Sequence, residues 1–67
     1  METLIIKEYL TVIKLDKESK LLFAYDIKDS IIDEQSEGIL SEVNELMYQK
    51  IVSHFHIKPE DFGVRIG

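Results

Sequence analysis

The sequence predicts an α+β fold of two layers, in which a small, mainly antiparallel sheet is covered on one face by one long amphipathic helix. Three observations predict it. Apolar residues recur every four positions from Glu34 to Phe55, two apolar runs flank a compact polar connection near the N-terminus, and a proline precedes a short apolar tail. A helical period, a hairpin pattern and a helix-stopping residue give the order β-β-α-β. We expect one domain over residues 1–67.

The stretch from Glu34 to Phe55 is the most periodic part of the chain. Steps of four give the apolar row Ile39, Val43, Met47, Ile51 and Phe55. Such steps place side chains one above another on a helix. Acidic residues come early and Lys50 and His54 late, which complements the helix macrodipole. Asp33 or Ser36 could supply the N-cap oxygen, and the apolar row is interpreted as core packing.

The N-terminal region is predicted to form a β-hairpin. The segment from Leu4 to Leu15 is rich in β-branched residues and reads as one strand with a break or bulge at Lys7-Glu8, although a helical alternative remains open. The polar residues 16–20 then connect it to a second strand over residues 21–25. Residues 26–33 are interpreted mostly as loop, with a strand extension or a helical turn as alternatives.

The tail is predicted to end the helix and return to the sheet. Pro59 cannot continue a helix interior, and with two acids after it favours a single helical turn. Residues 62–66 then form a third strand. A right-handed crossover would place that strand parallel to the second, with the first strand in the centre.

Strict alternation along the first strand predicts two apolar faces. One face would carry Leu4, Ile6, Leu10 and Val12, and the other Ile5, Tyr9, Ile13 and Leu15. One helix covers only one face, and strands that are apolar on both sides are normally covered on both. We therefore expect a homodimer or higher oligomer, formed by sheet faces, by strand edges or by the second helical row around Tyr48. The candidate oligomer surface comprises Ile5, Tyr9, Ile13, Tyr48 and Val52.

The net charge of −5 is concentrated in one segment. Its acids are Asp26, Asp29, Asp33, Glu34, Glu37, Glu42 and Glu45, against Lys28 alone. Such a field disfavours direct nucleic acid binding, which needs clustered Lys or Arg. These seven acids form a candidate interaction surface for a basic protein, and the alternative is a solvated face that keeps the chain soluble.

Composition limits the kinds of covalent link, metal site and membrane segment that the protein can have. The chain has no cysteine, so it has no disulfide framework or thiolate metal site. No uninterrupted apolar stretch is long enough to span a membrane, and the N-terminus does not read as a signal peptide. We expect a cytoplasmic protein.

No pattern of residues indicates a cofactor, a metal or a catalytic site. His54 and His56 straddle the predicted helix end, and a metal site there would need Glu60 or Asp61 as further ligands. The acids of residues 26–37 lack the alternation and central glycine of a calcium loop. The motifs of nucleophilic hydrolases, phosphate-binding loops and zinc proteases are absent from the sequence.

A short resemblance concerns the tail. The helix followed by Ile57-Lys58-Pro59-Glu60-Asp61-Phe62-Gly63-Val64-Arg65-Ile66 is similar to the helix-to-strand join of the small 4-oxalocrotonate tautomerase family. Those enzymes use an N-terminal proline as the base, whereas Glu2 follows Met1 here. The resemblance therefore implies a similar architecture without the activity.

The function expected from the sequence is that of a small acidic, non-enzymatic protein that binds other proteins and acts as a homo-oligomer. A sharper form is an inhibitor that presents the acidic segment to a basic site, by analogy with nucleic-acid mimics of phages and mobile elements. The alternative is a small oligomeric enzyme with a pocket between subunits, using Tyr9, His56 or Arg65.

Overall fold

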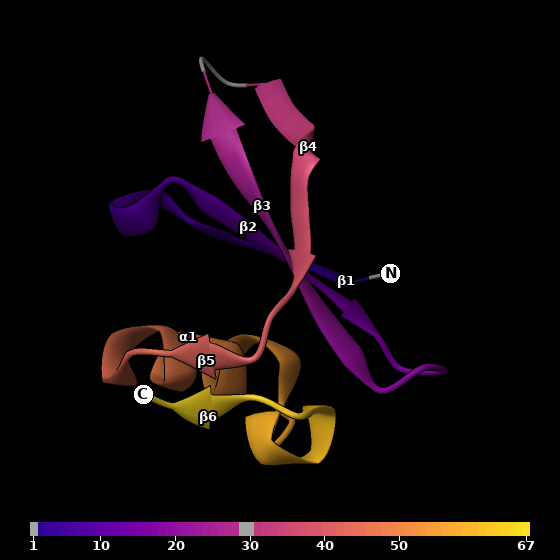
Figure 1. Cartoon of the computed structure of the whole chain (residues 1–67). Coiled ribbons are helices and arrows are strands. Elements are labelled where there is room, and N and C mark those ends of the chain that lie inside the picture. Colours follow the sequence, from indigo (N-terminus) through magenta and orange to yellow (C-terminus); the bar gives the residue numbers. More distant parts are fainter. Residues whose placement is uncertain (1, 29–30) are drawn as a thin grey trace.

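The larger layer of the molecule is a four-stranded antiparallel sheet. The computed structural model describes the backbone of residues 2–28 and 31–67, and the side chains of these residues except 28 and 31–37. The strands are β1 (Glu2–Ile6), β2 (Thr11–Asp16), β3 (Leu21–Lys28) and β4 (Ile31–Ile39). They lie in the order β1-β2-β3-β4, each antiparallel to its neighbour (Figure 1).

The second layer contains the helix and a very small parallel sheet. Its elements are β5 (Glu42–Val43), the helix α1 (Glu45–Phe55), the 3-10 turn η2 (Pro59–Phe62) and β6 (Arg65–Ile66). Strands β5 and β6 pair in parallel, and all four elements lie on the same side of the larger sheet (Figure 1). The predicted α+β class, with a mainly antiparallel sheet and one helix on one face, is confirmed.

Two tight hairpins build most of the sheet. In the first, the 3-10 turn η1 (Lys7–Tyr9) and a left-handed Leu10 reverse the chain. In the second, Oδ1 of Asp16 accepts hydrogen bonds from the backbone N–H groups of Glu18 and Ser19, at 3.1 and 3.3 Å. An aspartate that binds its own backbone in this way stabilises a turn. The predicted hairpin around residues 16–20 is confirmed.

The prediction that residues 4–15 form one strand is wrong. The break was expected at the right place, but the chain reverses there, and residues 4–15 supply two neighbouring strands. The reversal resets the alternation of side chains, so Ile13 and Leu15 share a face with Leu4 and Ile6. The predicted assignment of residues to the two faces is therefore corrected. Strand β1 lies at an edge of the sheet, and β2 and β3 lie in its centre.

The helix is half as long as the sequence pattern predicted. It begins at Glu45, and residues 34–39 belong to β4 instead. Neither Asp33 nor Ser36 is the N-cap, because Asn44 takes that position and its Oδ1 accepts a hydrogen bond from Met47 N at 2.9 Å. Gly38 pairs opposite Ala24 in β3. Strand pairing at residues 38–39 and 42–43 therefore outweighs the four-residue period of residues 34–44.

Two connections also differ from the prediction. Residues 26–33 are mostly strand, since β3 continues to Lys28 and β4 starts at Ile31, as the strand-extension alternative proposed. The last strand is confined to Arg65–Ile66 and pairs with β5, not with β3. The expected helical turn after Pro59 is confirmed as η2, with the proline at its first position.

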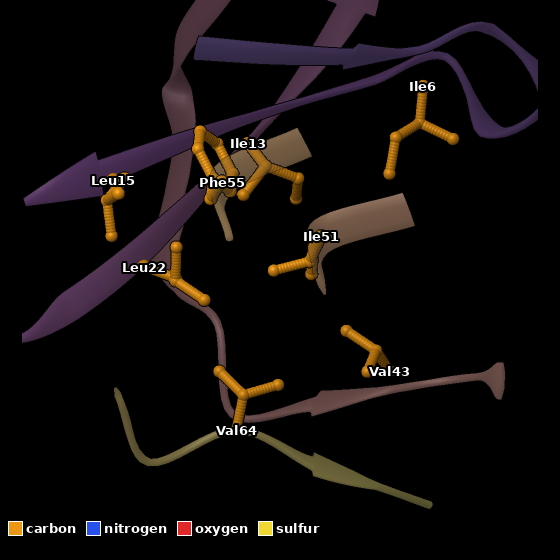
Figure 2. Close-up of a cluster of buried hydrophobic side chains, with 8 residues drawn as sticks. All are labelled: Ile6, Ile13, Leu15, Leu22, Val43, Ile51, Phe55 and Val64. Carbon is orange, nitrogen blue, oxygen red and sulfur yellow. The ribbon is translucent and has the colours of Figure 1, made fainter. Parts of the chain in front are cut away.

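The core lies between the larger sheet and the second layer. Figure 2 shows its eight buried side chains: Ile6, Ile13, Leu15, Leu22, Val43, Ile51, Phe55 and Val64. Four come from β1, β2 and β3, two from α1, and Val43 and Val64 from the region of the small sheet. A core assembled from segments this far apart in the chain holds both layers together, and its apolar burial is the main stabilising contribution.

Replacing Asn44 by alanine is expected to lower the free energy of unfolding by about 1 kcal/mol, the usual cost of losing an N-cap side chain. Asn44 is exposed, so the loss comes from the uncapped N–H of Met47 and not from packing. Urea denaturation followed by circular dichroism measures it. Asn44→Asp is the matched control and keeps the cap. Equal stability of the alanine and aspartate variants would contradict the assignment.

Candidate functional site

The face of the larger sheet opposite α1 carries several apolar side chains. Antiparallel register places Ile5 opposite Val12, Val12 opposite Tyr25, and Phe23 opposite Ile39, so these five side chains share one face. We call this set the open face. Ile5 and Ile39 are 57% and 61% exposed, Phe23 is half-buried, and Val12 and Tyr25 are buried.

Polar groups of both signs lie on the same side of the sheet as the open face. Lys14 is opposite Phe23, and its Nζ lies 4.8 Å from the ring centroid of Tyr25. A cation at this distance from an aromatic ring is attracted by the negative face of the ring. Asp16 follows two positions along β2 and therefore points to the same side. Among the side chains that the structure describes, the open face thus has an apolar centre flanked by the basic Lys14 and the acidic Asp16.

The structure does not bring the predicted oligomer surface together. Ile5 lies on the open face, whereas Ile13 is fully buried beneath α1, so including Ile13 in a surface is wrong. Tyr9 is exposed in η1, and Tyr48 and Val52 are half-buried on α1.

Phe23 and Ile39 of the open face were missed in the sequence. Alternation of Phe23 and Tyr25 with Leu22 and Ala24 was a usable signal for Phe23. Ile39 was assigned to the predicted helix and was therefore not considered as part of a sheet face.

The predicted acidic surface is divided between two parts of the molecule. Asp26 is exposed on β3, while Glu42 and Glu45 are exposed on β5 and at the start of α1. Asp33, Glu34 and Glu37 lie along β4, their side chains are outside the described set, and Asp29 lies outside the described residues altogether. Figure 1 shows the β3–β4 hairpin extending away from α1 and β5, so, among the described side chains, Asp26 of β3 is separate from Glu42 and Glu45.

Tyr48 and Glu60 connect the helix to η2. The Tyr48 hydroxyl donates a hydrogen bond to Oε1 of Glu60 at 2.5 Å. This bond to the carboxylate raises the pKa of Tyr48 and lowers the pKa of Glu60. Both shifts move away from neutrality, whereas a general acid or base works best with a pKa near the operating pH. We interpret the pair as a surface contact that positions η2 against α1.

His54 joins the helix to the edge of the sheet. Its Nε2 lies 2.9 Å from the backbone carbonyl oxygen of Thr3, and its ring meets Phe55 edge to face. On the same side, Lys50 forms an ion pair with Glu8 at 3.1 Å. The pKa of Glu8 is lowered, first by a backbone hydrogen bond at Glu8 itself and then by Lys50. These contacts fix α1 against β1 and η1.

Two shallow depressions are open to solvent. One, of about 620 Å³, is lined by Glu2, Leu15, Asp16, Lys17 and Glu18. The other, of about 400 Å³, lies between α1 and β1 and is lined by Leu4, Leu46, Gln49, Lys50, Ser53 and His54. Tyr9, His56 and Arg65, the groups considered for an enzyme, line neither of them, and Arg65 forms an ion pair with Glu42 at 3.6 Å.

The described residues hold neither a metal-binding cluster nor a membrane-spanning helix. No group of three or more histidine or acidic side chains among them is arranged to hold a metal ion, and His56 is an exposed, left-handed C-cap of α1. Within the same residues no helix has the length and apolar character needed to cross a bilayer.

Comparison with known proteins gives no relative from which a function could be transferred. A scan against protein-family models and searches among curated proteins and solved structures found no match to the chain.

Proposed function

We propose that this protein is a small, non-enzymatic protein-binding protein that acts as a homodimer, with the open faces of two copies packed against each other. The observation that carries the proposal is the exposure of Ile39 beside the half-buried Phe23, and of Ile5 two strands away on the same face, which α1 leaves uncovered. Exposed apolar surface is one mark of an interaction site.

Charge supports a second copy as the occupant of the open face. A two-fold dimer brings the same surface of each copy together, so the surface must be complementary to itself. The open face is flanked by Lys14 and Asp16, and an antiparallel arrangement of two copies allows Lys14 of each to approach Asp16 of the other. The net charge of −5 would oppose association through the acidic parts of the chain.

The available area supports the same occupant. A stable interface buries roughly 800 Å² on each partner. The chain has an accessible surface of 4602 Å² and extents of 31 × 24 × 19 Å, so one broad face is large enough. A domain of this size also has a thin core, which a second copy would extend.

Mutation of the open face tests the proposal. The wild-type protein is expected to sediment at twice the 7.8 kDa of one chain, and the double variant Ile5→Glu, Ile39→Glu as a monomer. Placing two carboxylates in an apolar interface is expected to weaken association by about 100-fold or more. The matched control is Leu10→Glu, Leu46→Glu, which changes two exposed apolar residues outside the open face.

Sedimentation equilibrium over a range of concentrations measures the association constant of each variant. Circular dichroism verifies that each of them is folded. A wild-type monomer at about 100 μM, or equal weakening by the control, would refute self-association through the open face.

A further inference from the structure

The depression between α1 and β1, which we call the α1–β1 depression, is formed by one row of helix residues and the edge strand of the larger sheet. Leu46, Lys50 and His54 are four positions apart and therefore lie one above another on the helix. His54 contacts the backbone carbonyl oxygen of Thr3, and Leu4 of the same strand lines the depression. Its volume of about 400 Å³ lies near the lower end of the roughly 300–1,000 Å³ that is usual for small-molecule sites.

The lining of the α1–β1 depression combines apolar contact area with hydrogen-bond donors. Leu46 is 46% exposed, and Leu4 is half-buried against the core. The described residues of the lining also include Lys50 and His54 and no aspartate or glutamate, although acids outnumber lysine and arginine by 13 to 8 in the chain. The described lining of the other depression contains three acids and one lysine. An anion is therefore favoured at the α1–β1 depression and repelled at the other.

Lys50 and His54 are both held in place by the protein itself. Nζ of Lys50 lies 3.1 Å from Oε2 of Glu8. Nε2 of His54 donates to the carbonyl oxygen of Thr3, 2.9 Å away, because this oxygen can only accept. An ammonium group has three N–H donors, so the ion pair with Glu8 leaves donors for a second anion. The Glu8 side chain is 52% exposed, and exposed ion pairs contribute little, so Glu8 competes only weakly for Lys50.

We propose that the α1–β1 depression binds a small amphipathic carboxylate. The apolar part of the ligand packs on Leu4 and Leu46, and its carboxylate forms an ion pair with Lys50 in competition with Glu8. Because the depression is open to solvent, the expected affinity is modest, with a Kd of about 1 mM or tighter. The site goes beyond the protein-binding role proposed above and is independent of it, because the open face lies on the other side of the larger sheet.

Three alkyl compounds of equal chain length test the chemistry of the ligand. Octanoate carries the carboxylate, octanol is uncharged, and octylammonium carries the opposite charge. Octanoate is expected to bind most tightly, and octylammonium at least about tenfold more weakly. Titration followed by nuclear magnetic resonance measures each Kd and locates the site. The shifts of backbone amides are expected to centre on Leu4 and on residues 46–54, and not on residues 15–18 of the other depression.

Substitutions in the lining test the charged and the apolar contact separately. Lys50→Gln is expected to raise the Kd for octanoate at least about fivefold, because the ion pair is lost. Its control is Lys58→Gln, at an exposed position outside the depression, with an expected change below about twofold. Leu46→Ser is expected to raise the Kd about threefold through lost apolar contact. Leu10→Ser, which alters an exposed leucine elsewhere, is the matched control. Circular dichroism verifies that each variant is folded.

Removing the competing carboxylate is expected to have the opposite effect. Glu8→Gln frees Lys50 and is expected to lower the Kd for octanoate about threefold. Glu18→Gln makes the same change in net charge at another exposed position, and its expected effect is below about 1.5-fold.

Four results would each overturn the proposal. They are equal binding of the three compounds, equal effects within either the lysine or the glutamate pair of variants, shifts spread over both depressions, and no binding of octanoate at about 10 mM. The association constant that sedimentation measures without octanoate is independent of all of them, so failure of this site and failure of the dimer are distinguishable.

Discussion

An aspartate in place of Ile13 is expected to unfold the protein at 25 °C, whereas an aspartate in place of Ile5 leaves the chain folded. Ile13 is fully buried between β2 and α1, among Ile6, Leu22 and Ile51. Burying an unpaired carboxylate costs several kcal/mol even after local relaxation. A domain of this length has a total stability of roughly 3–10 kcal/mol, so the substitution removes most or all of it.

Ile5 is the matched control because it has the same side chain on the neighbouring strand but is 57% exposed on the opposite face. Its replacement is expected to change the stability of the folded monomer by less than about 1 kcal/mol, as for other exposed positions. Far-ultraviolet circular dichroism and urea titration, at one protein concentration low enough to keep both variants monomeric, measure the difference. A folded Ile13→Asp variant, or similar losses at both positions, would contradict the placement of the two residues on opposite faces.

The contrast between Ile5 and Ile13 also shows why the faces could not be predicted. Side-chain alternation predicts which face of the sheet a residue occupies only as far as the next reversal of the chain. The polar pair Lys7-Glu8 indicated an interruption, but the sequence does not distinguish a bulge, which keeps the chain in one strand, from a turn such as η1. The left-handed Leu10 that completes this turn is unusual for a leucine, since glycine or asparagine is the ordinary signal there.

The helix was predicted correctly only where the four-residue apolar spacing and the contacts with the core favour the same structure. Met47, Ile51 and Phe55 keep their four-residue spacing, and all three pack toward the core. Ile39 and Val43 extend the same spacing by coincidence, because they lie in β4 and β5. Residues 34–38 include glycine and serine, which are weak helix formers, and the strand pairs with β3 on both sides of residues 34–37, at Asp33 and at Gly38.

Turns that are stabilised by a residue within the turn were predicted more successfully than strand pairings between distant segments. Asp16 and Pro59 act through neighbouring backbone groups, which the sequence shows directly. The pairing of β5 with β6 joins residues 42–43 to residues 65–66 through only two residues on each strand, and such short strands have no periodicity to detect. The candidate site has the same limitation, because Phe23 and Ile39 become neighbours only when β4 pairs with β3.

Replacing Phe55 by alanine is expected to be the most destabilising large-to-small substitution on α1. The ring is 4% exposed, lies in the core with Ile13, Leu15 and Leu22, and also meets the edge of His54. Removing a buried phenylalanine ring costs roughly 3–5 kcal/mol, from lost burial and from the cavity that remains. For a chain of this size each kcal/mol lowers the melting temperature by about 4–8 °C.

Phe62→Ala is the control for Phe55→Ala, because it removes the same ring from a half-buried position in η2. Its expected cost is about 1–2 kcal/mol, in proportion to the smaller apolar area that it buries. Calorimetry at one fixed protein concentration compares the two variants, since a dimer makes the melting temperature depend on concentration. If Phe62→Ala proved as costly as Phe55→Ala, the centre of the core would lie near η2. The Phe55 result therefore tests whether the last turn of α1, and not the C-terminal tail, is what fixes the second layer against the sheet.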